Sequence, residues 1–388
     1  MKANLQSLYH QGYHQVIKHL QQDNAQTPDE AQVKALATEW FQKEALLLPK
    51  ADQVELLDSI TYGIVGLGPL EFLLRDETVS EIMVNGANNI FVEKSGKLVK
   101  TNLAFVDDAQ VLQIINRIVG KIGRRIDEST PLVDARLLDG SRVNAIIPPL
   151  SLTGPTLTIR KFSKDVFTID KMVEHQSINA EMRDFLQEAV KSRKNILISG
   201  GTGAGKTSTL NACASLIPHS ERIVTIEDAA EIRIDHPHLI SLESRAANIE
   251  GQGEIPIRTL LKNALRMRPD RIVVGEIRSG EAIDMLQAMN TGHQGSLTTV
   301  HANSPLESLF RIETMVLMGN VDLPLSAIRP QIIQGIDLVC QQKRLVSGAR
   351  KIVSISAMVK DYQAKEYEMK EIFRYDDKTD KFIKSPNA

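Results

Sequence analysis

Cysteine is almost absent from this sequence: among 388 residues only Cys213 and Cys340 occur. They stand far apart, without the neighbouring Cys or His residues that a four-ligand zinc site requires. Two cysteines also cannot form a disulfide framework of the kind that holds small secreted proteins together. We therefore expect two buried thiols in the core of a protein from a reducing compartment.

Aromatic residues and net charge are also low, with 4% aromatic residues, a single Trp and a formal net charge of −2. These values do not favour a strand-binding groove, so we expect no nucleic acid as a partner. No apolar run approaches the ~20 residues of a membrane span. The N-terminus lacks the apolar segment of a signal peptide. These absences predict a cytoplasmic protein whose role at a membrane depends on partners.

The most informative stretch that is present is a glycine-rich loop after a short apolar run. The run Asn195–Ser199 is typical of a buried strand, and Gly200 to Thr207 matches G-x-x-x-x-G-K-[ST]. Glycines let backbone N–H groups surround phosphates, and the following helix adds the positive end of its dipole. An accidental match is expected roughly one time in a hundred for a chain of this length. We predict that the loop binds ATP and Mg²⁺, with Lys206 on the β- and γ-phosphates and Thr207 on the metal. The predicted binding residues are Gly200, Gly201, Thr202, Gly203, Ala204, Gly205, Lys206, Thr207 and Ser208.

The hydrophobic pattern divides the chain into four segments. Residues 1–50 carry a helical apolar stripe, which predicts an arm that packs on its own domain or docks on a partner. Residues 51–162 mix helices with short alternating strands and a turn at Asp139-Gly140, typical of a smaller α+β domain. Residues 163–178 are the predicted linker. Residues 179–388 alternate strands with helices, which predicts an α/β domain with a mostly parallel sheet and antiparallel strands at its end.

Two acidic clusters follow the phosphate loop. ATP hydrolysis needs a water molecule, a group that orients or deprotonates it, and positive charge for the transition state. Glu227 and Glu231 end a predicted strand in TIEDAAE, where the alternative is a solvated acidic turn. Glu276 follows the apolar strand Arg271–Val274 in RIVVGEIR. We predict that Glu276 orients the water or supports the Mg²⁺ shell, against the alternative of a buried strand that happens to end in Glu.

His293 and His301 flank another predicted strand, in TGHQGSLTTVHANSP. Metal ligation is poorly supported, because no further Cys or His lies close by. We favour neutral histidines that sense the γ-phosphate or hold a hydrogen-bond network over a purely structural role.

Arginines recur in the α+β segment. An arginine can clamp a γ-phosphate through two hydrogen bonds, although most surface arginines only solvate a face. In a ring of subunits, some of them would complete a neighbour's site. The arginines of this segment are Arg124, Arg125, Arg136, Arg142 and Arg160.

In this order, the phosphate loop, the acidic box, the second acid motif and the histidine box resemble the secretion-type ATPase superfamily of type II and type IV secretion, pilus and archaellum motors. The similarity covers about Asp76 to Met318. This chain lacks the paired CxxC motifs of type II secretion and type IVa pilus relatives, and has Ala229 where those usually have Pro. The run from RRIDESTPLVDARLLDGSRVNAIIPP to LTIRKF resembles the tight-adherence (Flp, or Tad) pilus-assembly ATPases of the CpaF type, with conjugation-type transfer ATPases next.

The resemblance implies a RecA-like P-loop ATPase domain and a hexameric ring, in which each N-terminal domain covers the nucleotide held by the C-terminal domain. Domain motion would drive inner-membrane platform proteins that assemble or retract a Flp/Tad type IV pilus. The protein would be cytoplasmic and peripheral to the inner membrane through those partners. Two alternatives are a conjugation-type (type IV secretion) transfer ATPase and a nucleotide-gated scaffold without catalysis.

The resemblance also assigns roles to the candidate residues. Glu276 would be the acid of the second motif, where Asp is usual, so metal support through water and general-base catalysis both remain open. Glu231 could share that task, and Glu227 would help to place the water. The remaining catalytic candidates are His293, His301, Arg136, Arg142 and Arg160.

Overall fold

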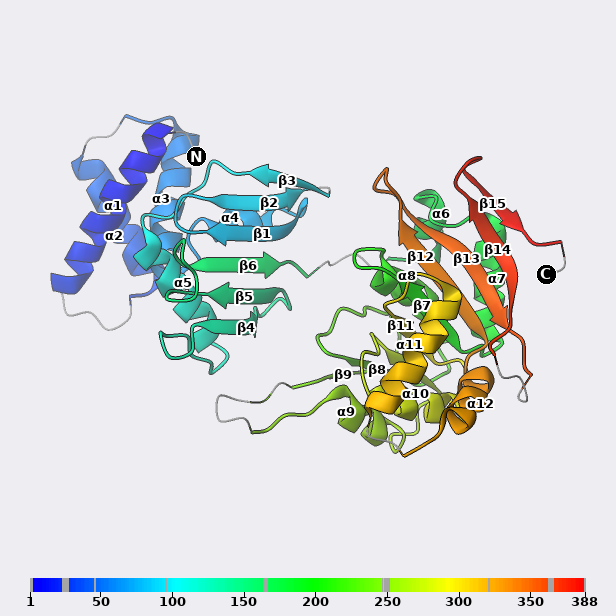
Figure 1. Cartoon of the computed structure of the whole chain (residues 1–388). Coiled ribbons are helices and arrows are strands. Elements are labelled where there is room, and N and C mark those ends of the chain that lie inside the picture. Colours follow the sequence, from blue (N-terminus) through cyan, green and yellow to red (C-terminus); the bar gives the residue numbers. More distant parts are fainter. Residues whose placement is uncertain are drawn as a thin grey trace. The chain divides into compact units, whose positions relative to one another are not determined.

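The computed structural model folds into two compact units, residues 1–164 and 165–388, which Figure 1 shows with their elements. The structure describes residues 3–22, 28–44, 47–94, 96–162, 167–245, 247, 252–319, 322–361 and 366–386.

The first unit begins with three helices that share one apolar cluster. These are α1 (Ala3–Gln22), α2 (Glu30–Lys43) and α3 (Lys50–Val65). Helix α2 starts at a capping box, in which the Asp29 side chain accepts from Gln32 N and the Gln32 side chain accepts from Asp29 N. Helix α3 lies beyond the predicted arm of residues 1–50, yet packs with α1 and α2. The helical part therefore extends to Val65, because α3 buries its apolar face against the other two helices.

These helices pack on the rest of their own unit. The Tyr9 hydroxyl of α1 and the buried side chain of Gln110 hydrogen bond to each other. Arg117 donates to the carbonyl oxygens of Ile64, at 2.6 Å, and Gly66. A Cβ at Gly63 would lie 2.7 Å from the Tyr9 hydroxyl, so the close approach of α1 and α3 requires glycine there. Of the two alternatives for residues 1–50, the structure shows packing on the chain's own unit.

A six-stranded antiparallel sheet forms the rest of the first unit, in the order β3-β2-β1-β6-β5-β4. Helices α4 (Leu70–Arg75) and α5 (Asp108–Gly120) contribute to the core of this sheet. Alternate residues of β1, β2, β5 and β6 enter that core, as a period of two requires, whereas β3 is exposed along its length. The strands are β1 (Val79–Asn85), β2 (Ile90–Lys94), β3 (Lys97–Lys100), β4 (Leu132–Arg136), β5 (Arg142–Ile146) and β6 (Thr156–Arg160).

The second unit contains a nine-stranded sheet in the order β15-β14-β13-β12-β7-β11-β10-β8-β9. The six strands from β12 to β9 are parallel, and β13 to β15 continue the sheet antiparallel. The strands are β7 (Ile196–Gly200), β8 (Ile223–Glu227), β9 (Leu239–Glu243), β10 (Arg271–Val274), β11 (Leu297–Val300), β12 (Leu338–Arg344), β13 (Arg350–Met358), β14 (Met369–Asp376) and β15 (Lys381–Lys384).

Two apolar clusters cover the two faces of this sheet. Leu197 belongs to the cluster with α9 to α12, whereas its neighbours Ile196 and Ile198 belong to the cluster with α6 to α8. Successive side chains of this strand thus enter two different cores on opposite faces of the sheet. That arrangement is typical of a parallel sheet covered by helices on both faces. The predicted α/β domain with a mostly parallel sheet is confirmed. The helices are α6 (Ile169–Glu174), α7 (Ala180–Lys191), α8 (Lys206–Ala214), α9 (Ile257–Ala264), α10 (Glu281–Asn290), α11 (Pro305–Met318) and α12 (Leu325–Gly335).

Two expectations need correction. The predicted linker 163–178 contains α6, whose Ile169 and Met172 are buried in the second unit's core, so this part of the segment is structural. Its residues 163–166 lie outside the described residues. The tail is not wholly antiparallel, because the crossover through α12 brings β12 back parallel to β7.

The two cysteines are free and buried, as expected, and burial raises the pKa of the Cys213 thiol to about 12. Of the helices in the described ranges, none combines the length and apolar character needed to cross a bilayer.

Candidate active site

The phosphate loop connects the central strand β7 to helix α8. Gly203 and Gly205 adopt φ values of +70° and +97°, which favour glycine. Gly205 is the N-cap of α8 and makes no side-chain cap, so the first N–H groups of the helix are left for a ligand. A Cβ at Gly200 would lie 2.5 Å from the Gln342 carbonyl oxygen, which explains why the neighbouring strand requires glycine there. The loop thus has the backbone that an anion cradle needs.

Lys206 begins α8 and its side chain is largely buried, with 8% exposure. Its Nζ donates to the Gly201 carbonyl oxygen at 3.2 Å and lies 3.2 Å from Nε2 of His301. Burial lowers the pKa of Lys206, while the negative charge of Glu276 opposes that shift. A partly desolvated ammonium held next to the loop interacts strongly with phosphate oxygens.

Glu276 and His301 reach this lysine from the two strands on one side of β7. Glu276 follows β10 and His301 follows β11, and the sheet order places β11 beside β7 and β10 beside β11. The two residues contact each other, because Nε2 of His301 lies 3.0 Å from Oε1 of Glu276. Burial lowers the pKa of His301, and the charge of Glu276 only partly opposes it. The ring is therefore neutral at pH 7. The structure brings Lys206, Glu276 and His301 together.

Arg278 is a site residue that motif reading did not single out. Its Nη2 and Nε donate to Oε2 of Glu276 at 2.6 and 2.8 Å, and its Nη1 donates to Asp228 at 3.3 Å. Partial burial opposes the charged form, but the hydrogen bond and charge of Glu276 outweigh it and raise the pKa of Arg278. The sequence feature that could have identified Arg278 is its position two residues after Glu276, at the end of RIVVGEIR.

Glu227, at the end of β8, holds the backbone of the acidic turn that follows it through hydrogen bonds to its carboxylate. Its Oε2 accepts from the backbone N–H groups of Glu231 and Ile232 at 2.7 and 2.9 Å, and its side chain is buried. Glycine at position 275 makes room for this carboxylate, since a Cβ there would lie 3.0 Å from Cγ of Glu227. Glu231 is half-buried, and its carbonyl oxygen accepts from Asn211 of α8 at 3.5 Å. The turn is thus tied to the helix of the phosphate loop.

His293 lies at the opposite end of β11 from His301. Its Nδ1 is 3.0 Å from the Pro269 carbonyl oxygen, and its own carbonyl oxygen accepts from the Ser296 hydroxyl. Because β11 runs parallel to β7, the amino end of β11 is at the sheet edge away from the phosphate loop. Within this unit, the structure does not bring His293 to the candidate site.

Arg136, Arg142 and Arg160, in the first unit, form one row across three strands. Arg142 of β5 is the register partner of both Arg136 of β4 and Arg160 of β6. The next residues, Val143 and Ile159, are buried in the core, so the arginines belong to the other face of the sheet. The sequence showed the arginines but not the register that aligns them.

The donor set fits Mg²⁺ better than a transition metal. The half-buried Thr207 in the first turn of α8 and the carboxylate of Glu276 offer the oxygen ligands that Mg²⁺ prefers, together with substrate phosphates. Among the described residues, no group of three His, Cys, Asp or Glu side chains is placed to hold a metal by itself. These residues fit a metal that is held jointly with a nucleotide.

Comparison with known proteins agrees with this geometry. Residues 64–386 match the family of the type II/IV secretion system protein. The chain belongs to that family. It is accordingly an ATP hydrolase with a two-unit, RecA-like ATPase fold.

Relatives in this family carry conjugation and secretion names. A putative conjugal transfer protein of Mycobacterium tuberculosis (strain CDC 1551 / Oshkosh) is 35% identical over 301 residues, which cover 76% of this chain and 85% of the relative. The type IV secretion system protein VirB11 of Bartonella henselae is 31% identical over 339 residues, which cover 77% and 93%. The secretion-type family expected from the motifs is confirmed, while the tight-adherence branch is not singled out.

Solved structures show the same fold. The ATPase DotB of Legionella pneumophila has a TM-score of 0.53 at 23% identity, over 75% of this chain and 80% of its own. The pilus retraction motor PilT with bound ADP has a TM-score of 0.56 at 20% identity, over 78% and 82%.

Proposed function

We propose that this protein is the ATP-hydrolysing motor of a conjugation-type (type IV) transfer system. The observation that carries the proposal is the contact of Lys206, His301 and Glu276 beside the phosphate loop, in a chain whose relatives include conjugal transfer proteins. These relatives favour transfer of DNA or effector proteins as the driven process. The role is mechanical, so we expect the chain itself to bind no nucleic acid.

Each residue at the phosphate loop has a separate task in hydrolysis. Lys206 and the N–H groups of the loop bind the phosphates, and Glu276 orients the attacking water or takes its proton. With its proton on Nε2, the neutral ring of His301 donates to Glu276 at 3.0 Å and presents Nδ1, 3.5 Å from Nζ of Lys206, as the acceptor for the lysine. The ring thereby holds Glu276 relative to Lys206. When bound, Mg²⁺ would neutralise developing phosphate charge with Thr207 among its ligands.

We further propose that the row of Arg136, Arg142 and Arg160 is a phosphate clamp. Like charges directly opposite each other on neighbouring strands repel, and a phosphate bound along the row would lessen that repulsion. Guanidinium groups bind phosphate oxygens through two hydrogen bonds. In a homo-hexameric ring, this row would contact the terminal phosphates of a nucleotide held by a second unit and connect hydrolysis to domain motion.

Partners follow from the mechanical role. We propose a cytoplasmic ring, peripheral to the inner membrane, that acts on membrane-bound components of the secretion machinery. Support comes from the resemblance of the four motifs to such motors and from relatives that carry secretion names.

Mg²⁺-dependent ATPase activity of the purified full chain tests the proposal. We expect Lys206→Ala to abolish nucleotide binding, and Glu276→Gln to lower kcat about 10²- to 10³-fold while ATP still binds. Lys370→Ala and Glu371→Gln, at two exposed positions of β14, are matched controls that should keep full activity. Full turnover in Glu276→Gln would contradict the mechanism. Tight ATP binding with background turnover in the wild type would instead indicate a nucleotide-gated scaffold.

A second candidate is assembly or retraction of a Flp/Tad type IV pilus. It is favoured by the run from Arg124 to Phe162, which resembles the tight-adherence ATPases. A deletion strain distinguishes the two, because loss of conjugal or effector transfer with normal surface pili supports the first proposal. Loss of pili with normal transfer supports the second. Neighbouring relaxase and coupling-protein genes would agree with transfer, and pilin and prepilin peptidase genes with a pilus.

A further inference from the structure

The β12–β13 hairpin lies directly against the phosphate loop. Strand β12 pairs with β7 as far as Gln342 opposite Gly200, where β7 ends and the loop begins. The Gln342 side chain accepts from the Thr209 hydroxyl of α8 at 2.8 Å. Beyond this contact, Arg350 donates from Nε to the Gly203 carbonyl oxygen at 3.1 Å. Both ends of the loop are therefore in contact with residues more than 130 positions downstream.

Arg344 lies opposite Arg350 in the hairpin and is exposed. Its Nη1 is 4.0 Å from the position that a Cβ on Gly203 would take. Two arginines directly opposite each other repel, and the loop carbonyl holds only one of them. Within the described part of the chain, the side chain of Arg344 has neither a hydrogen bond nor an ion pair.

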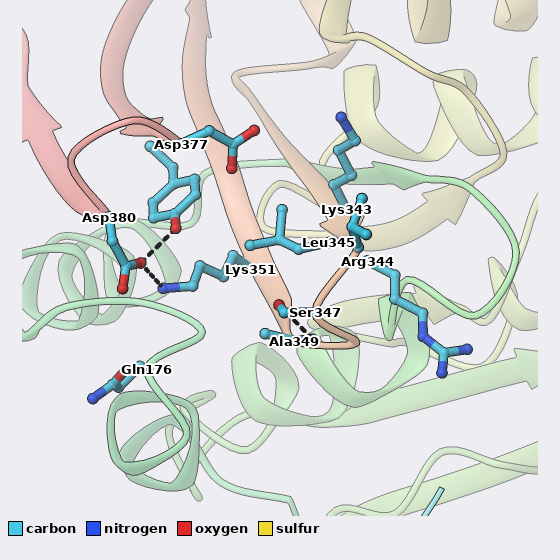
Figure 2. A pocket seen from close by; sticks show the side chains of 11 residues that line it. Gln176, Lys343, Arg344, Leu345, Ser347, Ala349, Lys351, Asp377 and Asp380 are labelled. Atoms are coloured by element: carbon cyan, nitrogen blue, oxygen red, sulfur yellow. Dashed lines mark hydrogen bonds and ion pairs between the residues drawn. The ribbon is translucent and has the colours of Figure 1, made fainter. Parts of the chain in front are cut away.

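The cavity beside the hairpin does not neutralise Arg344. It has a volume of about 530 Å³, and its acidic residues include Asp380, which contacts Lys351 at 2.6 Å and the Tyr375 hydroxyl. Figure 2 shows the Arg344 guanidinium well away from Asp377 and Asp380. The positive charge of Arg344 is therefore available to a ligand on the loop.

Strand order indicates which part of a nucleotide Arg344 faces. Glu276 and His301 approach β7 from the side of β11, whereas the hairpin approaches from the side of β12. Glu276, on the β11 side, is the residue that we assign to the attacking water at the terminal phosphate. A cation on the β12 side is then placed for the part of the nucleotide that hydrolysis leaves unchanged.

We propose that Arg344 is a further nucleotide-binding residue, which contacts the α- and β-phosphates common to ATP and ADP. Arg350 is a positioning residue that holds the loop through the Gly203 carbonyl oxygen. The inference rests on the proposed function, because it assumes that the loop binds a nucleoside triphosphate. It assigns to the second unit a cation that is independent of the arginine row in the first unit.

A contact that is equal for ATP and ADP affects binding but not the chemical step. Arg344→Ala should therefore weaken ADP and ATP by the same factor, about tenfold for an exposed charge-assisted hydrogen bond. It should raise KM with kcat nearly unchanged. Arg344→Lys keeps the charge but loses the planar fork, so its affinity should be intermediate.

Calorimetric titration of the full chain with Mg·ADP and with a non-hydrolysable ATP analogue, together with steady-state ATPase kinetics, tests the inference. Arg374→Ala, an exposed arginine on β14, is the matched control, and equal unfolding temperatures exclude a folding defect. If wild type binds and hydrolyses ATP and Lys206→Ala does not bind, the loop is a nucleotide site as the proposed function requires. Wild-type ADP affinity in Arg344→Ala, or a loss confined to the ATP analogue, would then overturn the role of Arg344. Absence of nucleotide binding in the wild type would overturn both.

Discussion

Nε2 of His301 lies 3.0 Å from the Glu276 carboxylate and 3.2 Å from Nζ of Lys206. One neutral ring thus connects the candidate water-orienting acid to the phosphate-binding lysine. A bound triphosphate would compete with this ring and with the Gly201 carbonyl oxygen for the hydrogens of Lys206. We expect nucleotide binding to turn the ring toward Glu276 alone, so that the acid is positioned when substrate is present.

The pH dependence of kcat should report the protonation of His301. Because burial lowers its pKa from the ordinary value of 6.5, the ring stays neutral at pH 7 and becomes charged only in more acidic solution. We expect kcat to be flat near neutrality and to fall below pH 6.5. His301→Gln should remove this acidic decline, whereas His293→Gln, at the other end of β11, should keep it. A decline centred above pH 7 in the wild type would contradict the assignment.

Removal of the charge of Lys206 should abolish activity and stabilise the fold. Burial lowers the pKa of Lys206 from 10.5, so the folded state binds the proton less tightly than the unfolded state. The free energy of unfolding therefore rises with pH between the lowered value and 10.5. We expect Lys206→Met to flatten this rise. At pH 7 it should raise Tm by about 2–4 °C, which corresponds to a gain of about 1 kcal/mol in the free energy of unfolding. A lower Tm would mean that the lysine contributes contacts that outweigh its desolvation.

Arg278 should act through the orientation of Glu276. Two hydrogen bonds from Arg278 hold one carboxylate oxygen, so Arg278→Ala leaves the acid positioned only by His301 at the other oxygen. We expect kcat to fall about tenfold with the affinity for ADP unchanged. Arg278→Lys should restore part of the rate, because one hydrogen bond can form again. An equal loss of ADP affinity would instead show that Arg278 binds the nucleotide directly.

Arg271 should be a stability residue although it belongs to the same motif as Glu276. Its side chain is fully buried and donates to Glu221 at 2.6 and 3.3 Å and to the carbonyl oxygens of Val190 and Gly295. Arg271→Ala leaves Glu221 with only the more exposed Arg193, at 3.3 Å, as its cation, so we expect a loss of about 3 kcal/mol in urea unfolding. The double variant Arg271→Met with Glu221→Gln should lose less. Equal losses in both variants would rule out the loss of the buried Arg271–Glu221 pair as the cause.

Much of the architecture was predictable because residues that are neighbours in the sequence determine it. The phosphate loop is a contiguous pattern of glycines, Lys206 and Thr207, and its flanking strand and helix follow from neighbouring periodicities. Glu276 was predictable for the same reason, since an acid after a short apolar strand reaches the carboxyl edge of a parallel sheet. Helix α6 was missed because its six residues carry too few turns to show a period. Helix α12 was missed although it has 11 residues, and its internal Pro330 is a residue that disfavours a helix interior.

The sequence by itself determined which chemistry the chain can perform, through residues whose roles depend on their nearest neighbours. Tertiary structure decided which residues perform it together. Strand order joined His301 rather than His293 to Lys206, sheet register aligned Arg142 with its two neighbouring arginines, and pairing of β12 with β7 brought Arg344 to the loop. These choices depend on long-range pairing, in which the burial of whole faces selects the partner and the register. No local pattern in the sequence records that selection.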